Sequence, residues 1–189
     1  MAVHAEHGVL VKGTLMQTPG APLEINTVTI GDHGGAVGMC CCPGRIEQHS
    51  DGAYRKRDLD EDLAMVSSWQ PNLVISLLEL HELEFLGVVE LPEELKKRFQ
   101  WLHYPVRDLA APSGVTRQDS PLPEWLSSVS RGERILLHCA AGLGRTGTVA
   151  ARLLMMAGQS SDSAIKQVRA ARPGTVESAS QERFLRTPR

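Results

Sequence analysis

The sequence predicts an α/β domain built on a central, mainly parallel sheet of about five strands flanked by helices. Short apolar runs alternate with stretches of helical periodicity through the middle of the chain, and this order is typical of a parallel sheet covered on both faces. The run LVISLL at residues 73–78 is apolar at nearly every position, as expected of a strand buried on both sides. With 189 residues, 42% hydrophobic and 22% charged, the chain is long enough for one folded domain with its own core.

The first elements are predicted to be two strands. Residues 23–30 (LEINTVTI) alternate between apolar and polar side chains, which indicates a strand with one buried face. A second strand is expected at residues 36–42, where Pro43-Gly44 ends it, and Gly34-Gly35 fits the turn between the two. Residues 1–22 show little periodicity, so we expect an N-terminal arm followed by a single domain at residues 23–189.

Helix caps and periodicity predict the remaining elements. Asp58 is expected to cap a helix that runs to about Trp69, because Glu61 follows three residues later and an apolar stripe begins there. Ser120 followed by Pro121 predicts the start of another helix. The other expected elements are helices at residues 79–86, 92–99, 146–157, 162–171 and 178–185, and strands at residues 73–78, 101–106 and 135–137.

Charge and cysteine usage exclude several classes of protein. The net charge is −2 and no segment is dominated by lysine and arginine, so we expect neither a nucleic-acid nor a membrane partner. No signal peptide is visible, and a reducing cytoplasmic location is the simplest expectation. The adjacent Cys40, Cys41 and Cys42 favour a packed strand over a metal site, because no Cys/His spacing completes a tetrahedral set. We therefore expect no metal or cofactor; the oligomeric state stays open.

The segment ILLHCAAGLGRTGTV, residues 135–149, is the part of the chain that indicates chemistry. An apolar strand leads into Cys139, a loop of small residues follows, and Arg145 opens an amphipathic helix. Such a loop can turn its N–H groups toward one anion, and Gly142 and Gly144 can take the positive φ that tight curling needs. A helix N-terminus and a guanidinium favour both a bound phosphate and a cysteine thiolate. The sequence therefore predicts a nucleophile under a bound phosphate.

HCAAGLGRTGT resembles the signature of the cysteine-based protein tyrosine and dual-specificity phosphatases. The segments CCPGRI and ELHEL resemble, more loosely, the kinase-associated phosphatase branch of that group. The resemblance implies a dual-specificity-phosphatase-like fold. It also implies hydrolysis of phosphotyrosine, and of phosphoserine and phosphothreonine, in proteins through a phosphocysteine intermediate, with no metal.

The resemblance also implies roles for particular residues. Cys139 would be the nucleophile, Arg145 the phosphate clamp, and Asp108, in WLHYPVRDLAAPS, the general acid; Asp119 is a weaker candidate for that role, since it directly precedes a helix start. The loop that would bind phosphate comprises Ala140, Ala141, Gly142, Leu143 and Gly144. In the family the residue matching His138 positions the loop, and a hydroxyl at Thr146 helps the thiolate to leave.

The sequence leaves open the role of Gln181 and the exact activity of the chain. Gln181 either orients the hydrolytic water, as a family glutamine does, or only completes a capping box with Ser178. The chain could be a catalytically weak phosphate-binding pseudophosphatase, a phosphatase for a small-molecule or RNA phosphate, or a sulfur-transfer or arsenate-reducing enzyme. The uncharged Ala140, Ala141 and Leu143 argue against a multiply charged lipid headgroup as substrate.

Overall fold

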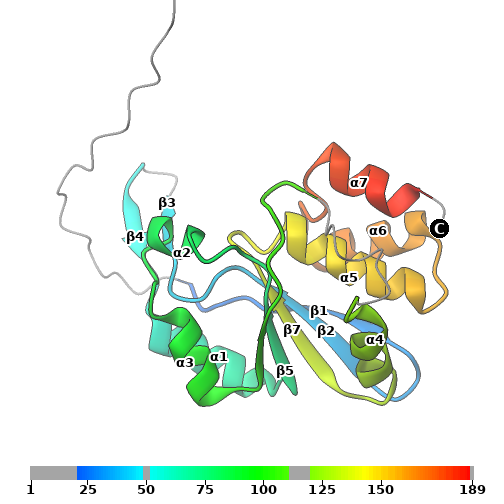
Figure 1. Ribbon diagram of the computed structural model, residues 1–189, viewed down its shortest axis with the longest axis horizontal. Coiled ribbons are helices and arrows are strands. Elements are labelled where there is room, and N and C mark those ends of the chain that lie inside the picture. Colours follow the sequence, from blue (N-terminus) through cyan, green and yellow to red (C-terminus); the bar gives the residue numbers. More distant parts are fainter. Residues whose placement is uncertain (1–20, 49–51, 111–119, 188–189) are drawn as a thin grey trace, which may run out of the picture.

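The computed structural model describes residues 21–48, 52–110 and 120–187, and its central feature is a five-stranded sheet (Figure 1). The strand order is β1-β2-β7-β5-β6; β1 pairs antiparallel with β2, and the other pairs are parallel. The sheet strands are β1 (Asn26–Ile30), β2 (Gly35–Cys40), β5 (Leu73–Ser76), β6 (Trp101–His103) and β7 (Arg134–His138). The predicted mainly parallel sheet of about five strands is confirmed.

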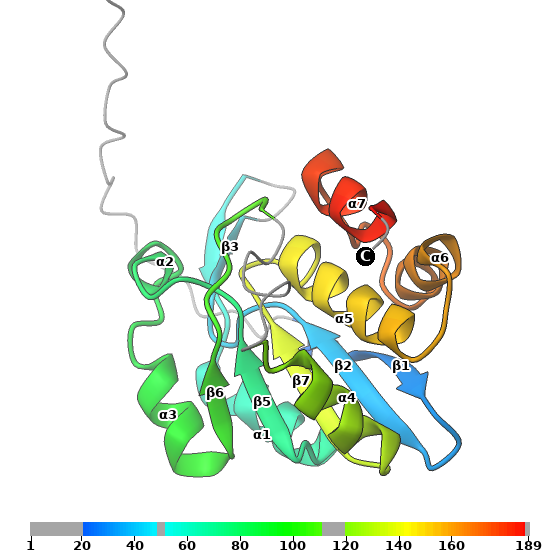
Figure 2. The same cartoon turned by 45° about the vertical axis from the view of Figure 1, so that its right-hand side comes forward.

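Helices cover both faces of this sheet, as Figure 2 shows. The first three helices pack on one face and the last four on the other. They are α1 (Leu59–Trp69), α2 (Glu82–Phe85), α3 (Leu91–Arg98), α4 (Leu122–Ser130), α5 (Gly144–Met156), α6 (Ser161–Ala171) and α7 (Ala179–Arg186). No helix in the three described ranges is both long and apolar enough to cross a membrane.

The central strand β7 shows why the sheet is buried on both sides. Ile135 and Leu137 point into the core beneath α4 to α7, whereas Leu136 points into the core beneath α1 to α3. All three are fully buried. Successive side chains of a strand point to opposite faces, so a continuous apolar run suits a strand between two helical layers.

Several predicted boundaries need correction. Strand β6 ends at His103, not at residue 106, although the N–H groups of Tyr104 and Val106 still bond to Ser76 and Leu77. Residues 79–86 form only the four-residue helix α2, which is followed by Gly87 at a φ of 66°. The small hairpin of β3 (Ile46–Gln48) and β4 (Tyr54–Lys56) was not predicted, since its strands are short and largely polar.

The helix starts follow the predicted caps with one shift. The side chain of Asp58 accepts a hydrogen bond from the Glu61 N–H at 2.9 Å, which confirms this residue as the cap of α1. Helix α4 begins at Leu122, one residue later than expected, with Pro121 at the boundary. The Ser120 hydroxyl still accepts a hydrogen bond from the Leu122 N–H at 3.4 Å.

Candidate active site

Cys139 directly follows strand β7 and therefore lies at the edge of the sheet where the parallel strands end. His138 is the last residue of the strand, Cys139 follows it, and residues 140–143 form a loop that leads into α5 at Gly144. Cys139 is only 2% exposed. Ligands of α/β sheets bind at this edge, and here the positive end of a 13-residue helix also faces the loop.

Two arginines from distant parts of the chain hold the carbonyl groups of this loop. Arg45 donates to the Ala140 carbonyl at 3.1 Å. Arg172 donates to the Ala141 carbonyl at 3.1 Å and to the Gly142 carbonyl at 2.8 Å. Among the described residues, no acceptor bonds to the loop N–H groups. Carbonyls fixed from outside leave these donors for an anion in the loop.

The two loop glycines serve different purposes. Gly142 has a φ of 72°, and a Cβ there would lie 2.3 Å from the Cys40 carbonyl oxygen, so only glycine fits. Gly144, in contrast, is the first residue of α5 and does not have a positive φ, which corrects the expectation for it. A Cβ at Gly144 would lie 2.9 Å from the Gln181 side chain, so close packing is what requires glycine at this position.

Glu82 of α2 holds the guanidinium of Arg145. Two parallel hydrogen bonds of 2.6 and 2.8 Å join the Arg145 nitrogens to the Glu82 carboxylate, and a third of 3.1 Å reaches the Val106 carbonyl. Arg145 is 2% exposed. A bidentate pair fixes the plane of the guanidinium as well as its position, so the clamp is oriented before any substrate binds.

The charge of Arg145 is balanced within the protein. Burial by itself lowers the pKa of Arg145, but the hydrogen bonds to Glu82, together with the electrostatic effects of Cys139, Glu82 and Asp108, raise it above its ordinary value. Burial raises the pKa of Glu82, but the hydrogen bonds from Arg145 and from the Glu79 N–H, together with the charges of Arg145 and His81, lower it below its ordinary value. The carboxylate of Glu82 thus offsets the charge of an arginine that stands at the positive end of a helix.

Asp108 lies across the same cavity. Its Oδ1 is 3.3 Å from an Arg145 nitrogen, and its side chain is 67% exposed. The cavity has a volume of about 140 Å³. Its lining residues are Asp108, Leu109, Cys139, Ala140, Ala141, Gly144, Arg145 and Glu177. The proposed nucleophile, clamp and acid thus share one small pocket; Asp119 lies outside the described residues.

His138 lies behind the loop and does not line the cavity. Its Nε2 is 2.5 Å from the Ser76 hydroxyl, which also accepts a 2.8 Å hydrogen bond from the Trp101 indole. Burial, followed by the charges of Arg145 and His103, lowers the pKa of His138 to about 3. A neutral His138 joins the ends of β5 and β7 beneath Cys139, which is a positioning arrangement.

Two other predicted residues, Thr146 and Gln181, are fully buried behind the cavity. The Thr146 hydroxyl has no hydrogen-bond partner among the described residues. The Gln181 Oε1 accepts from the N–H groups of Glu177 and Ser178 at 3.0 Å each, and the capping box with Ser178 is confirmed. Gly142 and Leu143 also do not line the cavity, so they contribute through the backbone of the loop.

Cys40, Cys41 and Cys42 are buried at the end of strand β2. The strand ends at Cys40 and not at residue 42 as predicted, so Cys41 and Cys42 lie just after it. Burial raises the pKa of each of these thiols, which keeps them protonated. Over the described ranges, no group of three or more His, Cys, Asp or Glu side chains is placed to hold a metal ion.

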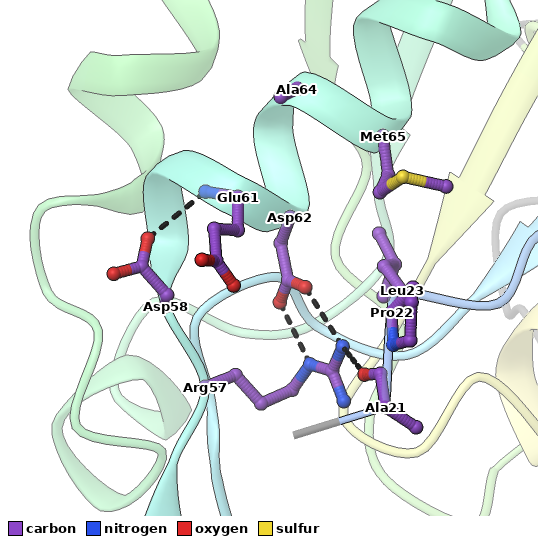
Figure 3. Close-up of a pocket in the computed structure, with 9 residues that line it drawn as sticks. All are labelled: Ala21, Pro22, Leu23, Arg57, Asp58, Glu61, Asp62, Ala64 and Met65. Atoms are coloured by element: carbon purple, nitrogen blue, oxygen red, sulfur yellow. Dashed lines mark hydrogen bonds and ion pairs between the residues drawn. The ribbon is translucent and has the colours of Figure 1, made fainter. Parts of the chain in front are cut away.

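A second cavity, of about 320 Å³, lies away from Cys139, between residues 21–23 and α1 (Figure 3). Two of its charged side chains, Arg57 and Asp62, are paired with each other. Arg57 makes two 2.8 Å hydrogen bonds to the Asp62 carboxylate, and Asp62 also accepts from the Gly44 N–H at 2.9 Å. These bonds connect the turn after β2 to α1, so we assign this cavity a role in the fold rather than in catalysis.

Sequence reasoning missed the residues that reach the site from elsewhere. Glu82 lies in the ELHEL segment, whose resemblance was noted without a role for this carboxylate. Arg45 is part of the similarly noted CCPGRI segment, whereas nothing local singles out Arg172 or Glu177. Their roles depend on contacts across 30 to 95 residues of sequence, as for Arg172 with Gly142 and Arg45 with Ala140.

Comparison with known families gives one match over most of the described chain. Residues 53–185 match the model of the Swiss Army Knife protein DSP-PTPase phosphatase domain, PTP-SAK. This range contains Asp108, the whole 138–146 motif and Gln181. It leaves out β1 to β3.

Solved structures agree with the fold. A structure of kinase-associated phosphatase with serine in place of its catalytic cysteine aligns with a TM-score of 0.73 at 22% identity, covering 90% of this chain and 94% of that one. Tk-PTP in its active form aligns with a TM-score of 0.59 at 30% identity, covering 83% and 93%. PTPMT1 in complex with PI(5)P aligns with a TM-score of 0.57 at 20% identity, covering 82% and 89%.

Proposed function

The chain belongs to the Swiss Army Knife DSP-PTPase phosphatase family, and from this premise we propose that it hydrolyses phosphate monoesters on protein side chains through Cys139. The observation that carries the proposal is the loop around Cys139. Arg45 and Arg172 bind its carbonyl groups from outside, and Arg145 is held in place by Glu82. This arrangement offers N–H donors and a planar guanidinium to one tetrahedral dianion above a thiol.

In the proposed first step, the Cys139 thiolate attacks phosphorus in line with the leaving oxygen. The loop N–H groups and Arg145 bind the three equatorial oxygens, where charge accumulates in the transition state. As the P–O bond breaks, Asp108 donates its proton to the leaving alkoxide or phenoxide. The products of this step are the dephosphorylated side chain, a phosphocysteine and the Asp108 carboxylate.

In the second step, water attacks the phosphocysteine. The Asp108 carboxylate accepts a proton from the water, the P–S bond breaks, and Cys139 leaves as a thiolate. The buried Thr146 hydroxyl, which lacks a partner among the described residues, supports its proposed role of donating a hydrogen bond to that thiolate. Gln181 is bonded to backbone at both ends of its amide, so we assign it no part in orienting the water.

The character of the cavity favours a singly phosphorylated protein side chain as substrate. The loop side chains of Ala140 and Ala141 are uncharged, and Asp108 and Glu177 place two carboxylates at the cavity wall. Carboxylates repel additional phosphate groups, so a multiply phosphorylated lipid headgroup fits poorly. We propose phosphotyrosine and phosphothreonine or phosphoserine peptides as substrates.

The direct test is hydrolysis of p-nitrophenyl phosphate and of phosphotyrosine and phosphothreonine peptides by the purified protein in EDTA. We expect turnover of all three, and an acid-quenched sample should carry one phosphoryl group on the peptide that contains Cys139. A phosphoinositide and a 5′-phosphorylated RNA serve as comparison substrates. A well-folded protein that binds phosphate but hydrolyses none of these esters would instead be a phosphate-binding module.

Replacing Glu82 with glutamine is expected to lower kcat/KM about 10²-fold, because the guanidinium of Arg145 loses its charged, bidentate partner and its fixed orientation. The measurement is steady-state hydrolysis of p-nitrophenyl phosphate. Glu84→Gln is the matched control, since Glu84 is an exposed carboxylate on the same helix. Equal activities of the two variants would mean that Arg145 needs no support from α2.

A further inference from the structure

The residue after Asp108 has an unusual backbone. Leu109 has a φ of 54°, in the left-handed region that a leucine rarely adopts. Its carbonyl oxygen lies 2.8 Å from the Ser178 hydroxyl and 2.8 Å from the Ser180 hydroxyl. Both hydroxyls donate, and one carbonyl can accept two hydrogen bonds. A strained residue persists where its surroundings hold it, and here the holding groups come from 69 and 71 residues away.

The next carbonyl along the chain is held by the same part of the molecule. The Gln181 Nε2 donates to the Ala110 carbonyl at 3.3 Å. The orientation of this amide is determined, because its Oε1 accepts from the N–H groups of Glu177 and Ser178. Two consecutive carbonyls after Asp108 are therefore bonded to the first turn of α7.

Helix α7 is packed into the core, so its first turn can hold these carbonyls in place. Gln181 is fully buried, Leu185 is 1% exposed, and Leu185 belongs to the core that α5 and α6 share. Asp108, in contrast, is 67% exposed, and its 3.3 Å contact with Arg145 is an ion pair at the edge of the cavity. An exposed ion pair by itself orders a loop weakly. The hydrogen bonds from α7 are thus the main geometric constraint on the segment that carries the proposed acid.

We propose that the first turn of α7 is a latch for the general acid: Ser178, Ser180 and Gln181 position Asp108 over the leaving oxygen by holding the Leu109 and Ala110 carbonyls. This inference rests on the proposed function and adds positioning residues to it. When the hydrogen bonds of the latch are removed, thiolate attack and phosphate binding stay unchanged. Proton donation, which depends on the distance from Asp108 to the leaving oxygen, becomes less efficient.

Leaving groups of different acidity separate these effects. In Ser180→Ala the cap of α7 by Ser178 remains, while Leu109 loses one of its two hydroxyl donors. We expect kcat/KM for phenyl phosphate, a poor leaving group, to fall about tenfold, and kcat/KM for 2,4-dinitrophenyl phosphate, which needs little protonation, to stay unchanged. Ser178→Ala/Ser180→Ala should show a larger difference between the substrates, and Asp108→Asn the largest.

Two controls and a second measurement complete the test. Ser160→Ala removes the N-cap of α6, and Ser163→Ala removes a hydroxyl in its first turn; neither should change the ratio of the two substrates. Amide hydrogen exchange at residues 107–110 should accelerate in Ser180→Ala without any need for turnover.

A failure of the latch can be distinguished from a failure of the proposed function. Equal losses on both aryl phosphates, or unchanged kinetics and unchanged exchange in Ser178→Ala/Ser180→Ala, would overturn the latch. Absence of hydrolysis in the wild-type protein would overturn the proposed function, and the exchange measurement would still decide whether α7 holds the loop.

Discussion

Replacing Cys139 with serine is expected to abolish hydrolysis of p-nitrophenyl phosphate, with a loss on the order of 10⁵-fold in kcat, as for other removed nucleophiles. A serine hydroxyl keeps its proton at neutral pH and would need a base to become a nucleophile. His138 is unsuited to be that base, because burial lowers its pKa to about 3 and its side chain does not line the cavity. The measurement is turnover in EDTA, together with the search for a phosphorylated Cys139 peptide.

The variant is expected to keep its fold and its phosphate site. Serine differs from cysteine only by the oxygen that replaces sulfur, and the hydrogen bonds of Arg45 and Arg172 to the loop carbonyls do not involve this side chain. Cys41→Ser is the matched control: Cys41 is also buried, but it lies outside the cavity, and burial raises the pKa of its thiol. Hydrolysis by Cys139→Ser at the rate of Cys41→Ser would remove Cys139 from the mechanism and refute the central proposal.

The second large effect is expected for Arg145→Lys, with a loss of roughly 10³-fold in kcat/KM. The Arg145 guanidinium bonds to Glu82 through two nitrogens and to the Val106 carbonyl, and still presents a planar fork to the cavity. A lysine ammonium has no planar fork, so it cannot pair bidentately with Glu82 and also with two phosphate oxygens. The buried pair keeps its charge balance, so the loss should appear in activity more than in folding.

Activity and thermal stability should be measured together for this variant. Arg183→Lys is the control, because Arg183 is an exposed arginine on α7, away from the cavity. We expect Arg183→Lys to match the wild-type protein in both measurements. If Arg145→Lys matched it too, positive charge alone would suffice and the bidentate clamp would play no part in transition-state binding.

The 138–146 motif could be interpreted from sequence because its parts are local. A strand, a loop of small residues and a helix start follow one another without interruption, and each has a direct signature in residue type and periodicity. The same is true of β5, whose continuous apolar run indicated burial on both faces. Asp108 lies two residues after Val106, whose N–H bonds to the Leu77 carbonyl just beyond β5, so its place at the edge of the sheet also followed from chain order.

Short elements were less predictable, since their local signals are weak. The hairpin of β3 and β4 has three-residue strands with polar side chains, and its pairing depends on contacts such as the Ile46 N–H bond to the Leu86 carbonyl. Gly144 was interpreted as a flexible loop residue, but the reason for a glycine there is the side chain of Gln181, 37 positions later.

The sequence by itself determined the class of fold, the nucleophile candidate, the clamp candidate and the acid candidate, because these depend on strand order and on one continuous motif. Tertiary structure alone decided how they are held. Glu82 orients Arg145, Arg45 and Arg172 bind the loop carbonyls, and the first turn of α7 bonds to the segment after Asp108. The physical reason is that hydrogen bonds and ion pairs between distant segments form only when the packed sheet and helices bring them together, and residue type alone carries no record of that proximity.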